Sequence, residues 1–168
     1  MHVTTRAALI LGLFTAMCTQ SRGEAAAQGV VMQRTLSLGM AKTIAEATLA
    51  ECKSQGYNTA AAVVDRSGQL LVLLRDEWAT SQMAEMARRK AYTARMFRMT
   101  TQEFQKRTLE DPGRAAQRDL VDILALSGGV PIQVDADTIG AVGSAGSTLD
   151  VDDGCAKAGV AKVAHLLK

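Results

Sequence analysis

The chain has 168 residues, of which 48% are hydrophobic, and this balance predicts one compact domain with a single core. Its formal net charge is only +2 and aromatic residues make up 4%. The sequence therefore lacks both the basic surface of a nucleic-acid-binding protein and the aromatic platforms that stack on bases. We expect no nucleic-acid partner.

The first 27 residues have the pattern of a secretory signal peptide. Arg6 precedes an apolar run over residues 7–19, which is too short to cross a bilayer as a mature helix. Small residues at 25–27 fit a signal-peptidase site, so we expect cleavage after Ala27. The mature protein would be periplasmic or secreted, without a membrane span. It would consist of an N-terminal extension over 28–34 and a domain over 35–168.

The first half of the mature chain alternates helical and strand patterns. Apolar residues at helical spacing predict an amphipathic helix from residue 38 to Gly56. Two short apolar runs, 58–66 and 69–75, flank a turn that contains Gly68 and predict a hairpin. A basic helix follows over 80–99, with Thr80 or Ser81 as its N-cap.

The second half also contains helices and a hairpin, in a different order. We expect a short helix capped by Thr100 and Thr101, a break at 111–113, a further helix over 114–125, a second hairpin over 130–143 and a last helix over 150–167. Helices and hairpins in this order predict an α+β fold in which helices pack on the faces of an antiparallel sheet.

Lys90 carries a charge in the middle of the apolar stripe of the 80–99 helix. Three interpretations of this position are open. The amine reaches water or an acid such as Asp65 at the edge of the core, or it lines a pocket for an anionic ligand with the help of Arg75, or it is a lysine of depressed pKa that acts as a base or forms a Schiff base.

Cysteine and histidine counts limit the chemistry further. Without the signal peptide the chain keeps one histidine, His165, and two cysteines, Cys52 and Cys155. These are too few for a His-rich or Cys-rich metal site, and a Ser-His-Asp or Cys-His arrangement would depend on one histidine in the last helix. The two cysteines either form a disulfide, if their helices lie side by side, or remain buried thiols.

Seven motifs in register give the chain a resemblance to a known family. Residues 87–97, ARRKAYTARMF, look like the AxxKAxTAxxF helix of the GlcG/HbpS family, the haem-binding domain that is similar to the C-terminal part of PduO. The other matching pieces are Leu36 to Leu38 with Ala41, the strand that ends at Arg75 and Asp76, Pro112-Gly113, residues 128–132, residues 139–146, and Asp152-Asp153 with Cys155, Ala156, Ala158 and Gly159.

The resemblance implies a specific architecture and a ligand. It implies an α-β-α sandwich of the profilin or roadblock kind, homo-oligomers from dimers to octamers, and haem as cofactor. By motif position, Thr93 becomes a candidate oxygen ligand of haem iron, Lys90, Arg88 and Arg89 candidate partners of the propionates, and Tyr92 a residue that stacks or ligates. We expect a pocket walled by the Lys90 helix, Arg75 and the segment with Gly143, Ser144 and Gly146.

The leading hypothesis is thus an exported accessory protein that binds haem or a similar planar anionic molecule. One alternative is an enzyme that acts on a small carboxylate or carbonyl compound, with Lys90 as base or anchor and Arg75 as a clamp for the carboxylate. A second alternative is an interaction subunit of an exported complex.

Overall fold

A computed structural model describes residues 29–168, and the predicted signal peptide lies outside them. Residues 29–32 are exposed and contain no helix or strand, whereas Gln33–Lys168 forms a compact unit. Its elements are α1 (Leu38–Ser54), β1 (Ala60–Val64), β2 (Leu70–Arg75), α2 (Ser81–Phe97), α3 (Thr101–Glu110), the 3-10 helix η1 (Pro112–Asp119), β3 (Gly129–Val134), β4 (Asp137–Ala145), α4 (Leu149–Lys162) and the 3-10 helix η2 (Ala164–Leu166).

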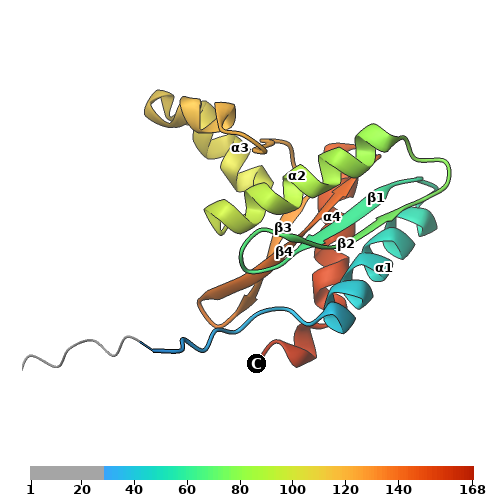
Figure 1. Cartoon of the computed structure of the whole chain (residues 1–168). Helices are drawn as coiled ribbons and strands as arrows, with labels where there is room; N and C mark the ends of the chain where they lie inside the picture. Colours follow the sequence, from blue (N-terminus) through green and yellow to red (C-terminus); the bar gives the residue numbers. More distant parts are fainter. Residues whose placement is uncertain (1–28) are drawn as a thin grey trace, which may run out of the picture. The chain divides into compact units, whose positions relative to one another are not determined.

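This unit has three layers (Figure 1). The four strands form one antiparallel sheet in the order β2-β1-β4-β3. Helix α2 crosses one face of the sheet, and α1 and α4 lie next to each other on the other face. The predicted α+β fold with helices on both faces is confirmed. No helix among residues 29–168 is long and apolar enough to cross a membrane.

Strand β1 supplies both cores because all of its residues are buried. Ala61 and Val63 belong to the large core beneath α1 and α4, which also contains Ile44. Ala60 and Ala62 point the other way and pack against α2. Alternate side chains of a strand face opposite sides of its sheet, so a strand that is buried on both faces is apolar throughout.

Glycines let α2 lie directly on the sheet. Gly129 and Gly143 are paired neighbours on β3 and β4. A Cβ atom on Gly143 would collide with the carbonyl oxygen of Ala87, and one on Gly129 would collide with the carbonyl oxygen of Lys90. The backbone of α2 therefore rests on backbone at these two positions, and a larger residue at either would push the helix away from the sheet.

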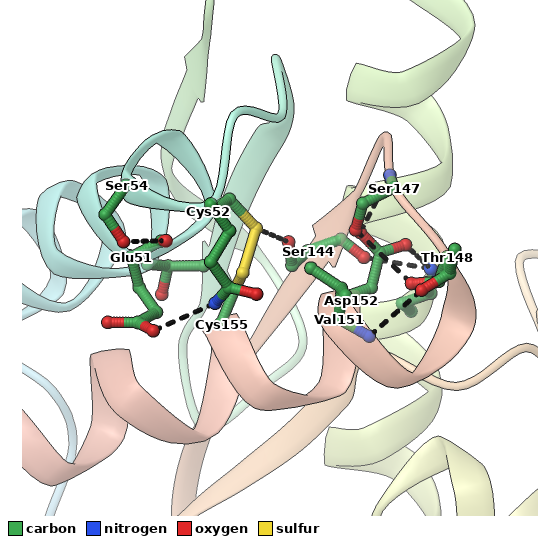
Figure 2. Close-up of a disulfide and its surroundings, with 12 residues drawn as sticks. Glu51, Cys52, Ser54, Ser144, Ser147, Thr148, Val151, Asp152 and Cys155 are labelled. Carbon is green, nitrogen blue, oxygen red and sulfur yellow. Dashed lines mark hydrogen bonds and ion pairs between the residues drawn. A yellow bond between two sulfur atoms is a disulfide. The ribbon is translucent and has the colours of Figure 1, made fainter.

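A disulfide joins the two helices of the other face (Figure 2). Cys52 of α1 and Cys155 of α4 have Cα atoms 5.5 Å apart and are fully buried. Of the two alternatives that the sequence left open, a disulfide or two buried thiols, the structure has the disulfide. It closes a loop between residues that are 103 positions apart in the chain.

One predicted element is wrong. The helix expected over 114–125 is replaced by η1, followed by an irregular stretch up to β3. None of the η1 residues is buried. A short helix in water gains most of its stability from packing an apolar face, and the residues of η1 bury no side chain against the rest of the protein. The last helix is also shorter than predicted, because α4 ends at Lys162 and a 3-10 turn follows it.

The disulfide is expected to contribute much of the stability of the fold. Replacing both cysteines (Cys52→Ala/Cys155→Ala) should lower the free energy of unfolding by about 2–5 kcal/mol, because the unfolded chain regains the freedom of a long loop. Urea titrations with and without dithiothreitol provide the measurement and its control. The reductant should shift the midpoint of the natural protein and leave that of the double variant unchanged. Equal midpoints for the natural protein and the double variant in the absence of dithiothreitol would contradict the expectation.

Candidate functional site

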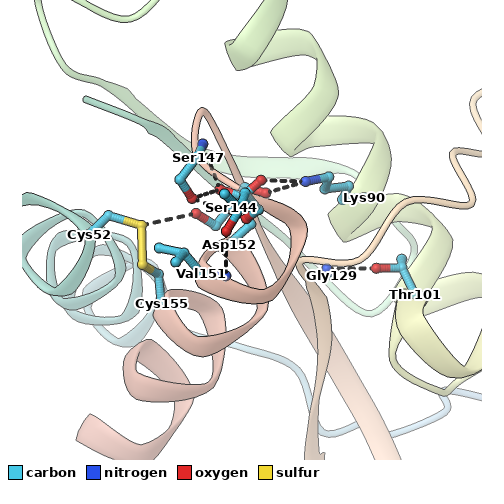
Figure 3. A network of polar contacts seen from close by, with 10 residues as sticks. Cys52, Lys90, Thr101, Gly129, Ser144, Ser147, Val151, Asp152 and Cys155 are labelled. Atoms are coloured by element: carbon cyan, nitrogen blue, oxygen red, sulfur yellow. Dashed lines mark hydrogen bonds and ion pairs between the residues drawn. A yellow bond between two sulfur atoms is a disulfide. The ribbon is translucent and has the colours of Figure 1, made fainter. Parts of the chain in front are cut away.

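Lys90 is at the centre of a buried polar network (Figure 3). Its Nζ donates to Asp152 Oδ2 at 2.7 Å and to the carbonyl oxygen of Ser144 at 2.9 Å. The Lys90 side chain is 0% exposed and that of Asp152 only 2%. The other carboxylate oxygen of Asp152 accepts hydrogen bonds from the hydroxyl and backbone N–H of Ser147. Every oxygen of this buried carboxylate therefore has a partner, as a buried charge requires.

Glycine makes the room that this ion pair needs. Gly128 has φ +119°, and a Cβ atom there would lie 2.9 Å from the Lys90 Nζ and 2.7 Å from the carbonyl oxygen of Ser144. The lysine passes the beginning of β3 at this point and reaches the N-terminal turn of α4. The ion pair thus connects α2, on one face of the sheet, with α4 on the other.

The network corrects the sequence-based interpretations of Lys90. Its partner is Asp152 and not Asp65. Burial lowers the pKa of Lys90, and the carboxylate of Asp152 opposes that change. The amine is enclosed by protein and lines none of the cavities described below. Because no path leads from solvent to the amine, Lys90 lacks the access to a ligand or substrate that two of the three interpretations require.

Arg75 lies apart from Lys90. It is exposed at the end of β2, and its guanidinium donates to the carbonyl oxygens of Asp76 and Ala79. These bonds hold the loop that leads into α2. Among residues 29–168 no hydrogen bond or ion pair joins Arg75 to Lys90.

The segment from Gly143 to Gly146 is packing surface and not a pocket wall. Gly143 lies against the backbone of α2, and Gly146, with φ +136°, lies against the backbone of Asn58 and Thr59. Ser144 is fully buried, and its hydroxyl lies 3.6 Å from Cys52 Sγ. A disulfide sulfur has no proton, so the serine is the donor in this contact. The pocket that the sequence placed here is filled by α2 and α1.

Three further predicted residues, Arg88, Arg89 and Thr93, bind a neighbouring segment of the chain, residues 120–124. Arg88 Nη2 donates to Asp122 Oδ1 at 2.7 Å, and Arg89 Nη2 donates to the carbonyl oxygen of Ile123 at 2.6 Å. The hydroxyl of Thr93 accepts from the Leu124 N–H at 2.8 Å.

Thr93 does not fit the role of an iron ligand in this arrangement. Its side chain is 0% exposed, and its hydroxyl donates to the carbonyl oxygen of Arg89 as well as accepting from Leu124. An axial ligand needs a free lone pair that faces an open site. The hydroxyl instead lies beneath the 120–124 segment.

An apolar cavity of about 440 Å³ opens between α2 and the 120–124 segment. We call it the α2 cavity. Its lining residues are Tyr92, Met96, Phe97, Leu120, Val121 and Ile123. Val121 is 85% exposed and Leu120 is 55% exposed, which is unusual for large apolar side chains unless something else covers them. Of the predicted site residues, only Tyr92 lines this cavity.

A larger cavity of about 660 Å³ lies beside β3, and its lining mixes charged and apolar residues. It includes Arg98, Glu103 and Arg107 and none of the predicted site residues. The carboxylate of Glu103 is already used in the capping box of α3. For a planar apolar ligand, the α2 cavity has the more suitable walls.

Comparison with known proteins places this geometry in a family. A family model described as "Haem degrading protein HbpS-like" matches residues 36–161. The chain belongs to the HbpS-like family. Among the described residues, the match covers β1 to β4, α1 to α3, α4 up to residue 161, and the α2 cavity, so the predicted resemblance to the GlcG/HbpS family is confirmed.

Individual HbpS-like relatives agree in sequence and structure. Protein GlcG of Escherichia coli strain K12 is 35% identical over 108 residues, which are 64% of this chain and 79% of GlcG. The crystal structure of HbpS is 34% identical, with a TM-score of 0.75 over 81% of this chain and 96% of HbpS. A structure titled as a PduOC:heme complex has the same fold, with 22% identity, a TM-score of 0.69, and coverage of 77% of this chain and 95% of that protein.

Sequence reasoning missed most of the lining of the α2 cavity. Arg89, Thr93 and Met96 are spaced i, i+4, i+7, which places them on one stripe of α2 and could have indicated a shared surface. Leu120, Val121 and Ile123 gave no usable signal, because they were assigned to a helix that does not form. Contacts with α2 that are remote in sequence determine their position.

Removing the charge of Lys90 should destabilise the protein. Lys90→Met leaves the carboxylate of Asp152 buried without its cation, so the free energy of unfolding should fall by about 3–5 kcal/mol. Lys90→Met/Asp152→Asn should lose less than the sum of the two single variants, because the double variant buries no unpaired charge. Chemical denaturation followed by circular dichroism measures the free energy of unfolding of the two single variants and the double variant.

The exposed ion pair of Lys106 and Glu110 provides a matched control. Lys106→Met should cost less than about 1 kcal/mol, since exposed pairs contribute little. If Lys90→Met is as mild as this control, the amine is not the structural charge that its burial indicates.

Proposed function

We propose that this protein binds haem in the α2 cavity. The observation that carries the proposal is the set of apolar and aromatic walls formed by α2 and residues 120–123, in a member of a family described as haem degrading and HbpS-like. A porphyrin is flat and mostly apolar, so a cleft lined by Tyr92, Phe97 and exposed aliphatic side chains suits its faces.

The α2 cavity also offers donors that haem iron accepts. Tyr92 contributes a phenol and Met96 a thioether, and both types of side chain serve as axial ligands of haem in proteins. When bound, haem supplies an iron centre for redox or oxygen chemistry. The chain supplies the apolar walls and the donor atom. Tyr92 and Met96 replace Thr93 as the candidate iron ligands.

Arg95 is the candidate partner for the propionates. It precedes Met96 on α2, and its Nε is buried without a hydrogen-bond partner. Burial lowers the pKa of Arg95 and the positive charges of Arg66 and Arg98 add to that effect, whereas the carboxylates of Asp137 and Asp65 oppose it. A carboxylate that binds this guanidinium would give Nε the partner that it lacks. Arg88 is less available, because Glu85 and Asp122 already pair with it and raise its pKa.

The two alternative functions receive less support. An enzyme that uses Lys90 as a base would need substrate at an amine that is fully enclosed and paired with Asp152. A carboxylate clamp that combines Arg75 with Lys90 lacks the contact between them, since the bonds of Arg75 go to the loop before α2. The role of an interaction subunit has no specific observation in its favour.

A charged residue in the wall of the α2 cavity should prevent haem binding. Val121→Asp places a carboxylate at an exposed position of the lining, so the fold should persist while the affinity for haem falls by at least about ten-fold, the effect of 1.4 kcal/mol. Titration of the purified protein with haem, followed through the Soret band, gives the affinity.

Leu109→Asp is the matched control, because Leu109 is also an exposed apolar residue but lies on α3 outside the α2 cavity. It should bind haem like the natural protein. Tyr92→Phe and Met96→Leu then identify the axial donor by a shift of the Soret band. A natural protein that shows no saturable Soret change at stoichiometric haem rules out the proposal.

We also propose that the protein is exported and works in an oxidising compartment. The disulfide between Cys52 and Cys155 supports this location, since structural disulfides persist mainly outside the cytoplasm. Fractionation of cells that express the full chain should place the protein outside the cytoplasm. Its measured mass should be that of a chain whose first residue is Gln28. Replacing Leu11 and Leu13 by Asp interrupts the apolar run and should keep the chain inside at its full length. A full-length cytoplasmic natural protein would refute export.

A further inference from the structure

The 120–124 segment forms one side of the α2 cavity but has little structure of its own. It contains no helix or strand, and its one backbone hydrogen bond is a turn from the Ile123 N–H to the carbonyl oxygen of Leu120 at 3.2 Å. Only Ile123 in it is buried. A segment with so few backbone bonds and buried side chains opens more easily than a helix or a strand in a sheet.

Three polar contacts with α2 hold this segment in place. They are the ion pair of Arg88 with Asp122, the bond from Arg89 to the carbonyl oxygen of Ile123, and the bond from the Leu124 N–H to the hydroxyl of Thr93. Arg88 and Arg89 are adjacent on α2 and Thr93 follows one turn later. The helix thus presents two donors and one acceptor that match consecutive residues of the segment.

Asp122 is the strained point of the segment. Its φ of +66° lies in the left-handed region, which residues other than glycine adopt rarely and which Asp tolerates better than most. The ion pair with Arg88 holds Asp122 in this conformation, and both side chains are partly exposed, at 26% and 40%. Opening the segment would release the backbone strain at the cost of this solvent-accessible ion pair, the two hydrogen bonds with Arg89 and Thr93 and the burial of Ile123, so a small set of interactions opposes it.

From these contacts we infer that residues 120–124 are a movable wall of the α2 cavity, and that Arg88, Arg89 and Thr93 are positioning residues that hold this wall closed without touching the ligand. The inference rests on the proposed haem site for its ligand. It assigns to three residues of the family-like helix a role different from iron or propionate binding. A planar ligand would enter and leave by displacing the wall from α2.

The ion pairs of Arg88 allow a matched comparison, because this arginine also pairs with Glu85 within its own helix. Asp122→Asn weakens the contact with the wall, whereas Glu85→Gln weakens only the contact within α2. Transfer of haem from the protein to an excess of apomyoglobin gives the dissociation rate. Asp122→Asn should raise this rate about five-fold, the effect of roughly 1 kcal/mol, and Glu85→Gln should leave it unchanged.

Thr93 separates a positioning role from an iron ligand. Thr93→Val leaves the Leu124 N–H without its acceptor and should raise the dissociation rate about ten-fold, while Thr93→Ser keeps the hydroxyl and should restore the natural rate. The Soret band should have the same position in all of these variants. A shifted band in Thr93→Val would show that the hydroxyl contacts the iron, and equal rates for Asp122→Asn and Glu85→Gln would show that the wall does not control release. Either result overturns the inference.

The wall can also be tested in the ligand-free protein. Hydrogen–deuterium exchange of a peptide that covers residues 118–126 should be faster in Asp122→Asn and Thr93→Val than in the natural protein, with Glu85→Gln unchanged. If the natural protein fails to bind haem but the exchange differs as expected, the proposed ligand is wrong and the movable wall stands. If exchange is the same in all variants, the wall itself is wrong.

Discussion

The buried ion pair of Lys90 and Asp152 connects the three layers of this protein. A charged amine from α2 passes the sheet at Gly128 and meets a carboxylate on α4, with both charges removed from water. Burying two charges costs several kcal/mol per ion, and only good geometry and further hydrogen bonds offset this cost. Ser144 and Ser147 supply those bonds. The pair thus ties α2 to α4 across the sheet at the position of Lys90.

Close backbone packing fixes the position of α2 in the other directions. Ala87, Ala91 and Ala94 face the sheet, and Gly129 and Gly143 let the helix backbone approach it. Because this face of α2 packs on the sheet, a neighbouring stripe of the helix, which includes Arg89 and Thr93, contacts residues 120–124. The α2 cavity forms there because residues 120–124 contact the helix through polar atoms and leave the side chains of Leu120 and Val121 exposed. A structural charge on one side of α2 therefore helps to determine where the α2 cavity forms on the other.

The sequence predicted much of the fold but little of the site. Strands β1 to β4 and the helices α1 to α4 were expected close to their observed positions, because each has a clear period of apolar residues and recognisable caps or turns. The stretch 114–125 was misjudged because the helix-forming residues of its first half, in η1, bury no side chain against the rest of the protein. Lys90 was correctly recognised as a charge on a buried face, but its partner is 62 residues away and could not be read from local spacing.

The amino-acid sequence by itself determined the class of fold, the family and the presence of a charge that has to be neutralised inside the protein. These properties follow from local periodicity and residue type. Tertiary structure alone decided that Asp152 neutralises Lys90, that Cys52 and Cys155 meet, and that Thr93 is covered by residues 120–124. Each of these depends on which surfaces of distant elements come together. The fit of side chains across layers sets that arrangement, and no local pattern in the chain encodes it.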